Sequence, residues 1–173
     1  MKIAGYGCRG INPARRQSFI ITEELTNTIS LEDYCRNWLK EPPPPRLKRA
    51  LISRVAVMAG KLHENGLNHR DFYICHFLLK LPFDLNYDKL DLYLIDLHRV
   101  QIRKKIPQRW IIKDIAGLYF SAMNIGLTKY DLFRFFKIYK KKSLREIFKN
   151  EKHFLTQVQK KAEALYERLK KGG

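Results

Sequence analysis

The feature that most constrains this chain is the segment His69-Arg70-Asp71, which directly follows a long helical pattern. Apolar residues recur every three or four positions over residues 47–64, which predicts a helix, and Asn65-Gly66 supplies the signal that ends it. A second isolated aspartate, Asp96, stands at the end of the apolar run 92–95, which predicts a short buried strand. We therefore expect one carboxylate on a loop after a helix and another at the end of a strand.

Two carboxylates placed in this way meet the needs of phosphoryl transfer. Protein kinases have a catalytic loop of the form H-R-D-x-x-x-x-N, whose Asp accepts the proton of the attacking hydroxyl, and a separate Asp that binds Mg²⁺. His69-Arg70-Asp71 matches the start of this motif, and His76 stands where the motif has Asn. Asp71 is the candidate general base and Asp96 the candidate Mg²⁺ ligand. The structural alternatives are an Asp71 that caps a local turn and an Asp96 that accepts backbone N–H groups.

The charge of the chain points to an anionic partner. Lys and Arg number 34 against 17 Asp and Glu, so the net charge is +17. Such a surface suits a nucleotide, a phosphorylated substrate, an anionic membrane surface or a nucleic acid. A basic nucleic-acid-binding domain is the weakest of these alternatives, because the sequence has no helix-turn-helix, zinc-finger or RNA-recognition signature. We therefore expect no nucleic-acid partner.

The cysteines and the hydropathy indicate a cytosolic protein. Cys8, Cys35 and Cys75 are odd in number and have no C-x-x-C spacing, which argues against a disulfide framework or a structural zinc site. No apolar run has the length of a membrane span, and the first residues do not lead into a signal-peptide pattern. We expect a cytoplasmic protein, peripheral at most to a membrane.

The remaining patterns predict a mostly helical domain with short strands. Ser30 and Asp33 have the spacing of a capping box, which predicts a short helix to about residue 39. The prolines at 42–45 predict a rigid connector. Further strands are expected over residues 17–22, 77–81 and 90–95, and further helices over residues 110–123, from 128 on, 143–148 and about 150–170.

Taken together, these residues resemble the lipopolysaccharide core heptose kinases, which are small-molecule kinases with a protein-kinase-like fold. Cys75-His76 after the H-R-D motif, and Asp96-Leu97-His98 in place of Asp-Phe-Gly, are unlike protein kinases and similar to this family. Most of residues 5–125 take part, in the segments Arg9-Gly10-Ile11-Asn12-Pro13, Phe19-Ile20-Ile21-Thr22-Glu23, Asn68-His69-Arg70-Asp71, Leu94-Ile95-Asp96-Leu97-His98-Arg99 and Lys113-Asp114-Ile115-Ala116-Gly117.

The resemblance implies transfer of the γ-phosphate of ATP, with Mg²⁺, to a heptose of the lipopolysaccharide inner core, at the cytoplasmic side of the inner membrane. It implies that Arg70 supports the catalytic loop by pairing with nearby acids or carbonyls, and that Glu23 contacts the nucleotide. His76 is expected either to contact a phosphate or to ligate the metal, although imidazole is a poor Mg²⁺ ligand. Asp114 is interpreted as a structural anchor of the loop. The basic stretch 99–109 is the candidate acceptor surface, with a solvated loop as its alternative.

The resemblance also implies that most of an N-lobe is missing. Gly5-Tyr6-Gly7-Cys8-Arg9-Gly10 matches the G-x-G-x-x-G phosphate loop, but the stretch from there to His69 is too short for the remaining N-lobe elements. We therefore expect an α+β, protein-kinase-like fold that is mainly the helical C-lobe, with residues 1–28 as a remnant of N-lobe strands and hinge and residues 29–173 as the C-lobe. The alternative function is that of a truncated, catalytically impaired kinase remnant, a pseudokinase.

Overall fold

The computed structural model describes residues 2–12, 15–84, 86, 87 and 89–172. Pro13, which contributes to the family resemblance, lies outside these residues. The elements in chain order are β1 (Ile3–Arg9), β2 (Gln17–Thr22), β3 (Thr28–Ser30), α1 (Leu31–Cys35), α2 (Pro45–Glu64), β4 (Leu67–Asn68), β5 (Phe77–Lys80), β6 (Leu92–Leu94), β7 (Gln101–Ile102), α3 (Gln108–Ser121), α4 (Lys129–Lys140), α5 (Leu144–Asn150) and α6 (Lys152–Gly172), with single 3-10 turns at Ile74–His76 and Leu97–Arg99.

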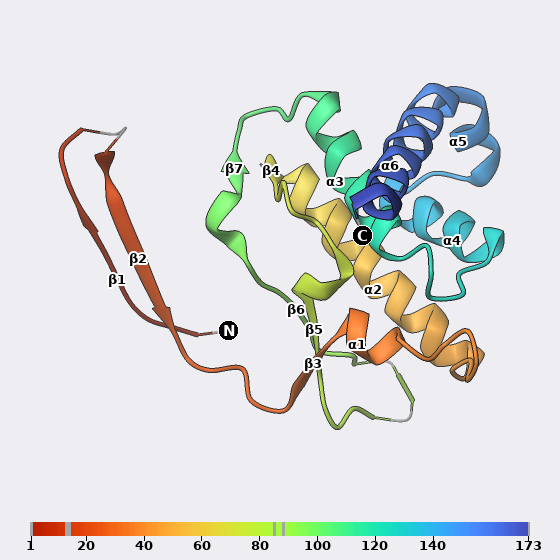
Figure 1. The fold of residues 1–173 in the computed structure, drawn as a ribbon, viewed down its shortest axis with the longest axis horizontal. Coiled ribbons are helices and arrows are strands. Elements are labelled where there is room, and N and C mark those ends of the chain that lie inside the picture. Colours follow the sequence, from red (N-terminus) through yellow and green to blue (C-terminus); the bar gives the residue numbers. More distant parts are fainter. Residues whose placement is uncertain (1, 13–14, 85, 88, 173) are drawn as a thin grey trace.

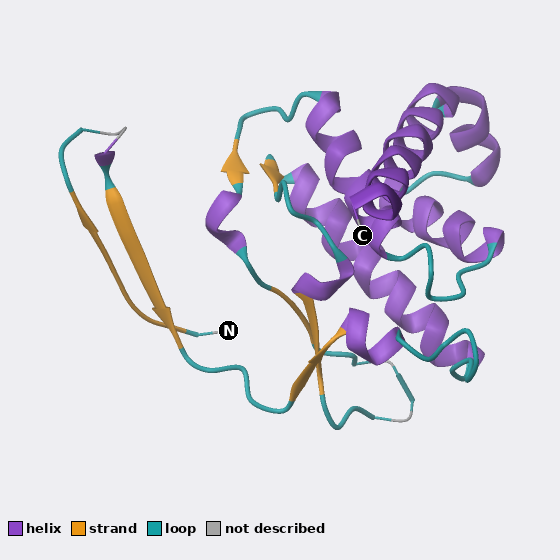
Figure 2. Cartoon of the chain, viewed as in Figure 1, coloured by secondary structure: helices purple, strands orange, loops and turns teal. Residues whose placement is uncertain are grey.

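The fold has a helical body and a separate two-stranded hairpin (Figure 1). Helix α2 packs against α4, and α3 packs against α6, so the buried stripes of four helices meet in one core. Leu51 and Val55 of α2, together with Phe154 and Val158 of α6, are buried in this core. Figure 2 shows that helices dominate the body and that its strands are short. The predicted α+β fold with a mainly helical lobe is therefore confirmed.

Two small antiparallel sheets bring the loops of the body together. In the first, β5 lies between β3 and β6, with Leu79 opposite both Ile29 and Leu92. The backbone N–H of Ile95 donates to the carbonyl of His76 across 3.0 Å, which extends the pairing of β5 and β6 to the position before Asp96. This pairing places Asp96 beside the catalytic-loop segment.

The second sheet pairs β4 with β7, immediately before the H-R-D segment. Gly66 precedes β4 with a φ of +77°, and a Cβ atom built on it would lie 2.0 Å from the carbonyl oxygen of Arg103. Only glycine allows both this backbone conformation and this close approach. Gly66 therefore serves two purposes, since it ends α2 and admits the neighbouring strand.

Most predicted helices and strands are confirmed, but some begin or end at other residues than predicted. Helix α2 begins at Pro45, two residues before the predicted start, because proline is well suited to the first turn of a helix. Helix α1 ends at Cys35, so the prediction of a helix to about residue 39 was wrong. The chain continues in hydrogen-bonded turns, in which Trp38 N donates to Cys35 O at 3.1 Å, before the proline run.

The β1–β2 hairpin lies apart from the helical body (Figure 1). Residues 1–28 were expected as a remnant of N-lobe strands and hinge, and the structure pairs β1 with β2 from Ile3 opposite Thr22 to Arg9 opposite Gln17. The G-x-G-x-x-G match therefore falls largely on a paired strand. The boundary predicted between residues 28 and 29 stays a prediction, and β3, which spans it, pairs with β5 of the body.

Candidate active site

A buried aspartate of α3 holds the backbone of the H-R-D segment. Asp114 is fully buried, and its two carboxylate oxygens accept the backbone N–H groups of His69 at 2.6 Å and Arg70 at 2.8 Å. A buried carboxylate is tolerated only when its oxygens are hydrogen-bonded. The loop N–H groups therefore satisfy Asp114 of α3, and Asp114 in turn fixes the loop backbone. The expectation that Asp114 anchors the loop is confirmed.

Helix α3 also holds the far end of the loop. The Oγ atom of Ser121 accepts the backbone N–H of Ile74 at 3.0 Å. Between these two anchors, a Cβ atom on Gly117 would lie 3.1 Å from the Tyr73 ring and 3.2 Å from the carbonyl oxygen of Phe72. The loop therefore lies against the helix at a position where any side chain would push it away.

Asp71, the candidate base, lies in a partly enclosed position. Its side chain is 16% exposed, and its Oδ1 atom accepts the Arg99 Nη1 donor at 2.8 Å. The Oδ2 atom is out of contact with solvent and has no hydrogen-bond partner among the described residues. One oxygen of Asp71 is thus occupied by a cation, while the other retains unused accepting capacity.

His76 connects Asp71 to Asp96. Its Nδ1 atom lies 2.7 Å from the carbonyl oxygen of Asp71, and because a carbonyl can only accept, Nδ1 carries the proton of this bond. Its Nε2 atom faces the Oδ2 atom of Asp96 at 3.4 Å. The structure therefore brings the three candidate residues together, with His76 between the two carboxylates.

Asp96 has an unusual backbone and two imidazole neighbours. Its φ and ψ are +62° and +49°, in the left-handed region that non-glycine residues occupy at some energetic cost, often at functional sites. His98 Nδ1 is in hydrogen-bonding contact with Asp96 Oδ1, whereas His76 faces the other carboxylate oxygen, Oδ2. The carboxylate stays about one-third exposed, so it is open to a ligand.

These donors fit a Mg²⁺ ion that is completed by phosphate. Among the described residues, no group of three or more His, Cys, Asp or Glu side chains is arranged to hold a metal alone. Kinase-type Mg²⁺ sites use one or two carboxylates and take their other oxygens from phosphates and water. The accessible carboxylate of Asp96 meets this requirement, whereas His76 offers only a nitrogen.

The side chain of Arg70 takes a different partner from the one expected. We predicted a pairing with acids or carbonyls, but the guanidinium lies 5.6 Å from the centre of the Trp110 ring. Its Nε atom has no hydrogen-bond partner in the described part of the chain. Arg70 has a left-handed backbone, with φ of +77°, and its guanidinium lies over an indole of α3 whose ring attracts a cation. Arg109 and Lys113 approach the same indole.

Glu23 does not lie with the other candidate residues. It directly follows β2, which belongs to the hairpin set apart from the body (Figure 1). It forms an ion pair with Lys2 at 3.3 Å and is largely exposed. Its expected contact with a nucleotide stays a prediction.

Sequence reasoning missed several partners of the site. It did not pair Arg99 with Asp71, and it did not assign roles to His63 or Tyr139. A partial signal for His63 existed, because it continues the buried α2 stripe of Val55, Ala56, Ala59 and Gly60.

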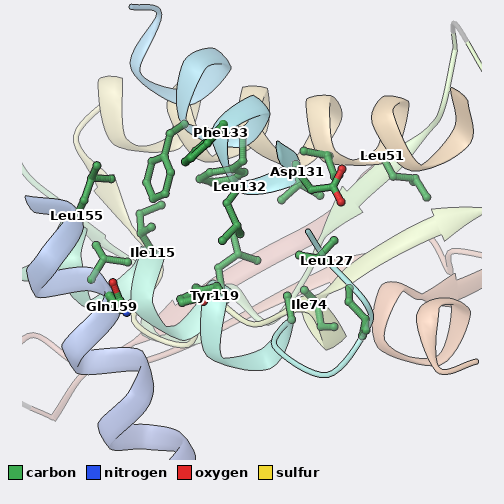
Figure 3. A pocket seen from close by; sticks show the side chains of 18 of the residues that line it. Leu51, Ile74, Ile115, Tyr119, Leu127, Asp131, Leu132, Phe133, Leu155 and Gln159 are labelled. Carbon is green, nitrogen blue, oxygen red and sulfur yellow. The ribbon is translucent and has the colours of Figure 1, made fainter. Parts of the chain in front are cut away.

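A large apolar cavity lies elsewhere in the body, between α2, α3, α4 and α6. Its volume is about 430 Å³, and its lining is almost entirely aliphatic and aromatic (Figure 3). Asp131 and Gln159 are polar exceptions in the wall. A shallower groove adjoins it, shares Phe133 and Leu144 with it, and is bordered by the basic side chains Arg134, Lys137, Lys141 and Lys142.

An H-R-D loop anchored by a buried helix aspartate, with a second aspartate at the end of a neighbouring strand, defines the catalytic lobe of a protein-kinase-like fold. The chain belongs to the lipopolysaccharide kinase (Kdo/WaaP) family, whose model matches residues 1–139. None of the described helices combines the length and apolar character needed to cross a membrane.

Three comparisons place the chain within this family. It is 56% identical over 173 residues to the lipopolysaccharide core heptose(I) kinase WaaP of Escherichia coli K12, covering all of this chain and 65% of that protein. It is 51% identical over 173 residues to the WaaP of Pseudomonas aeruginosa PAO1, again covering all of this chain and 65% of the relative. A solved structure of WaaP in complex with acyl carrier protein superposes with a TM-score of 0.88 at 51% identity, over 96% of this chain and 69% of that one. The chain thus spans slightly less than two thirds of these curated relatives.

Proposed function

We propose that this chain carries the catalytic lobe of an ATP-dependent kinase that phosphorylates a heptose of the lipopolysaccharide inner core. The observation that supports this most directly is the convergence of Asp71, His76 and Asp96 on one loop edge, where the Asp71 carboxylate is partly exposed beside Arg99. The proposed acceptor, a heptose of the lipopolysaccharide core, is taken from the names of the relatives.

In the proposed reaction, Asp71 orients the heptose hydroxyl and accepts its proton while the hydroxyl oxygen bonds to the γ-phosphorus of ATP. The bond from that phosphorus to the bridging oxygen breaks, and ADP leaves with the electron pair. Asp96 would hold Mg²⁺, which neutralises phosphate charge when it is bound. His76 keeps the Asp71 backbone in place through its Nδ1–H bond.

The basic stretch after Asp96 is the proposed acceptor surface. Arg103, Lys104 and Lys105 are exposed there, and Arg99 lies at its start beside Asp71. Lipopolysaccharide carries anionic sugars and phosphates, so cations beside the base would attract and orient it. We place the protein in the cytoplasm, peripheral to the inner membrane, where ATP and the membrane-held acceptor meet.

Phosphate transfer from labelled ATP to purified heptose-containing core tests this function on the complete gene product. Asp71→Asn removes only the proton acceptor, and we expect the turnover rate to fall by about 10²-fold or more. Asp91→Asn, at an exposed position between β5 and β6, is the matched control and should leave the rate unchanged. No transfer by the unaltered protein would favour the impaired-remnant alternative, and transfer that survives Asp71→Asn would remove Asp71 from the mechanism.

A second candidate function is the binding of an acyl carrier protein, as in the complex of the related WaaP. The cavity of about 430 Å³ falls within the usual size range of small-molecule sites and is apolar enough for a fatty acyl chain (Figure 3). The adjoining groove, with Arg134 and Lys137 at its border, would offer positive charge to an anionic patch on such a carrier.

This second function is tested with acyl carrier protein that carries a long fatty acyl chain and with the same protein without it. We expect the acylated form to bind more tightly by calorimetry, Leu132→Trp to remove that advantage by filling the cavity, and Lys137→Glu to weaken both forms. Lys149→Glu, an exposed residue outside the groove, is the charge-matched control. Equal binding of both forms would show that the cavity takes no acyl chain.

A further inference from the structure

A buried hydrogen-bonded chain runs from α4 to the catalytic loop. The hydroxyl of Tyr139 lies 2.7 Å from Nδ1 of His63 on α2, and Nε2 of His63 lies 3.3 Å from Oδ2 of Asp114 on α3. The same Oδ2 atom accepts the backbone N–H of His69. Three helices are thereby connected, side chain to side chain, to the residue two positions before the candidate base.

The partners decide where the protons lie. A carboxylate can only accept, so Nε2 of His63 carries a proton, and in the neutral ring Nδ1 then accepts the proton of the Tyr139 hydroxyl. Burial raises the pKa of Tyr139, with the negative charge of Asp114 adding to the effect, so the hydroxyl keeps its proton and remains a donor. Each hydrogen bond therefore has a defined donor: the Tyr139 hydroxyl donates to His63, and His63 donates to Asp114.

The chain is enclosed, so water cannot replace a missing member. The side chains of His63 and Asp114 are 5% and 0% exposed, and the Tyr139 ring stacks on Phe135 and contacts His63 edge to face. The donors to Asp114 among the described residues are the two loop N–H groups and His63. Without His63, the orientation of the carboxylate would depend on the loop alone.

We infer that His63 and Tyr139 are positioning residues for phosphoryl transfer, which fix the Asp114 carboxylate so that the His69–Asp71 backbone, and with it the Asp71 side chain, keeps its reactive placement. The inference rests on the proposed kinase function for its effect on turnover. The structural effect on the loop does not depend on that function, so the two are tested separately.

The structural test is hydrogen exchange of the His69 and Arg70 backbone amides in the complete gene product. Tyr139→Phe removes one hydroxyl, and His63→Phe keeps a ring but removes both nitrogens. We expect both amides to exchange about three- to tenfold faster, while amides in the middle of α3 keep their rates. His63→Gln places an amide N–H near the position of Nε2 and should restore most of the protection.

The kinetic test uses the same variants and compares turnover with substrate affinity. Tyr139→Phe should lower kcat several-fold with the KM for ATP unchanged, and His63→Gln should retain more activity than His63→Phe. Tyr166→Phe is the control, because it removes an exposed tyrosine hydroxyl that bonds Asn124. Unchanged exchange at His69 and Arg70, or an equal increase at all slow amides, would overturn the inference and leave an ordinary core contact. If the unaltered protein transfers no phosphate, the exchange rates of His69 and Arg70 still test whether His63 and Tyr139 position the loop.

Discussion

Arg99 Nη1 donates to Asp71 Oδ1 across 2.8 Å, and this ion pair joins the catalytic loop to the turn that follows Asp96. Asp71 Oδ2 is shielded from solvent, so the oxygen that a substrate reaches first is the one that Arg99 already occupies. The pair can orient the carboxylate for the hydroxyl, and it places a positive charge beside the position at which the acceptor would bind.

Replacement of Arg99 by Met keeps the length of the side chain and removes its charge and donors. We expect kcat to fall about tenfold, because Asp71 loses a charge-assisted hydrogen bond that is partly screened by solvent. Arg99→Lys should keep part of the rate, since it retains the charge but not the planar guanidinium. Steady-state kinetics on the complete gene product checks this, and a rate that rises in Arg99→Met would mean that Arg99 restrains the base.

Asp96→Asn should weaken nucleotide binding in the presence of Mg²⁺ more than in its absence. The carboxylate would help to hold the ion, yet without Mg²⁺ it only repels the phosphates, so metal-free ATP should bind as well or better. Calorimetric titration with and without Mg²⁺ measures the two affinities. An equal loss under both conditions would indicate a structural role for Asp96.

His76→Asn restores the residue that the H-R-D-x-x-x-x-N motif has at this position. An amide oxygen is a better Mg²⁺ ligand than an imidazole nitrogen, so we expect half-maximal activity at a several-fold lower Mg²⁺ concentration. The measurement is the rate as a function of Mg²⁺ at saturating ATP. A raised KM for ATP with no change in the Mg²⁺ requirement would instead assign His76 to phosphate contact.

Asp131 should contribute stability that is lost in acid. Burial alone would raise its pKa, but hydrogen bonds from Lys48 and Thr128 and the charge of Lys48 outweigh burial and lower the pKa below its ordinary value. The contribution is therefore present above the unfolded-state pKa of about 3.9 and is lost as the pH falls through the lower folded-state pKa.

The Asp131→Asn variant tests this dependence by urea unfolding at several pH values. We expect it to lower the free energy of unfolding by about 2–3 kcal/mol at pH 7, because it breaks a largely buried pair and weakens the α4 cap. The difference from the unaltered protein should shrink below about pH 4. Asp91→Asn, at an exposed site, is the control, and a difference that stays constant with pH would contradict the assignment.

Local chemistry explains the elements that could be predicted from the sequence. Thr128 and Ser143 begin α4 and α5 with complete capping boxes, whose partners are three residues away in each case. The end of α1 could not be predicted in this way, because the turns after Cys35 bury Trp38 in a core made by distant helices. The bounds of β1 and its pairing with β2 were not predicted within the expected N-lobe remnant of residues 1–28, since β1 has no alternating pattern of its own.

The sequence by itself determined the family, the long helices and the two aspartates, because each depends on a motif or a period within a few turns of chain. Tertiary structure alone decided which partners those aspartates have. Arg99 reaches Asp71, and Tyr139 reaches Asp114 through His63, only because β5–β6 pairing and helix packing bring distant segments together. Such contacts depend on the positions of several elements at once, and no local pattern of residues records those positions.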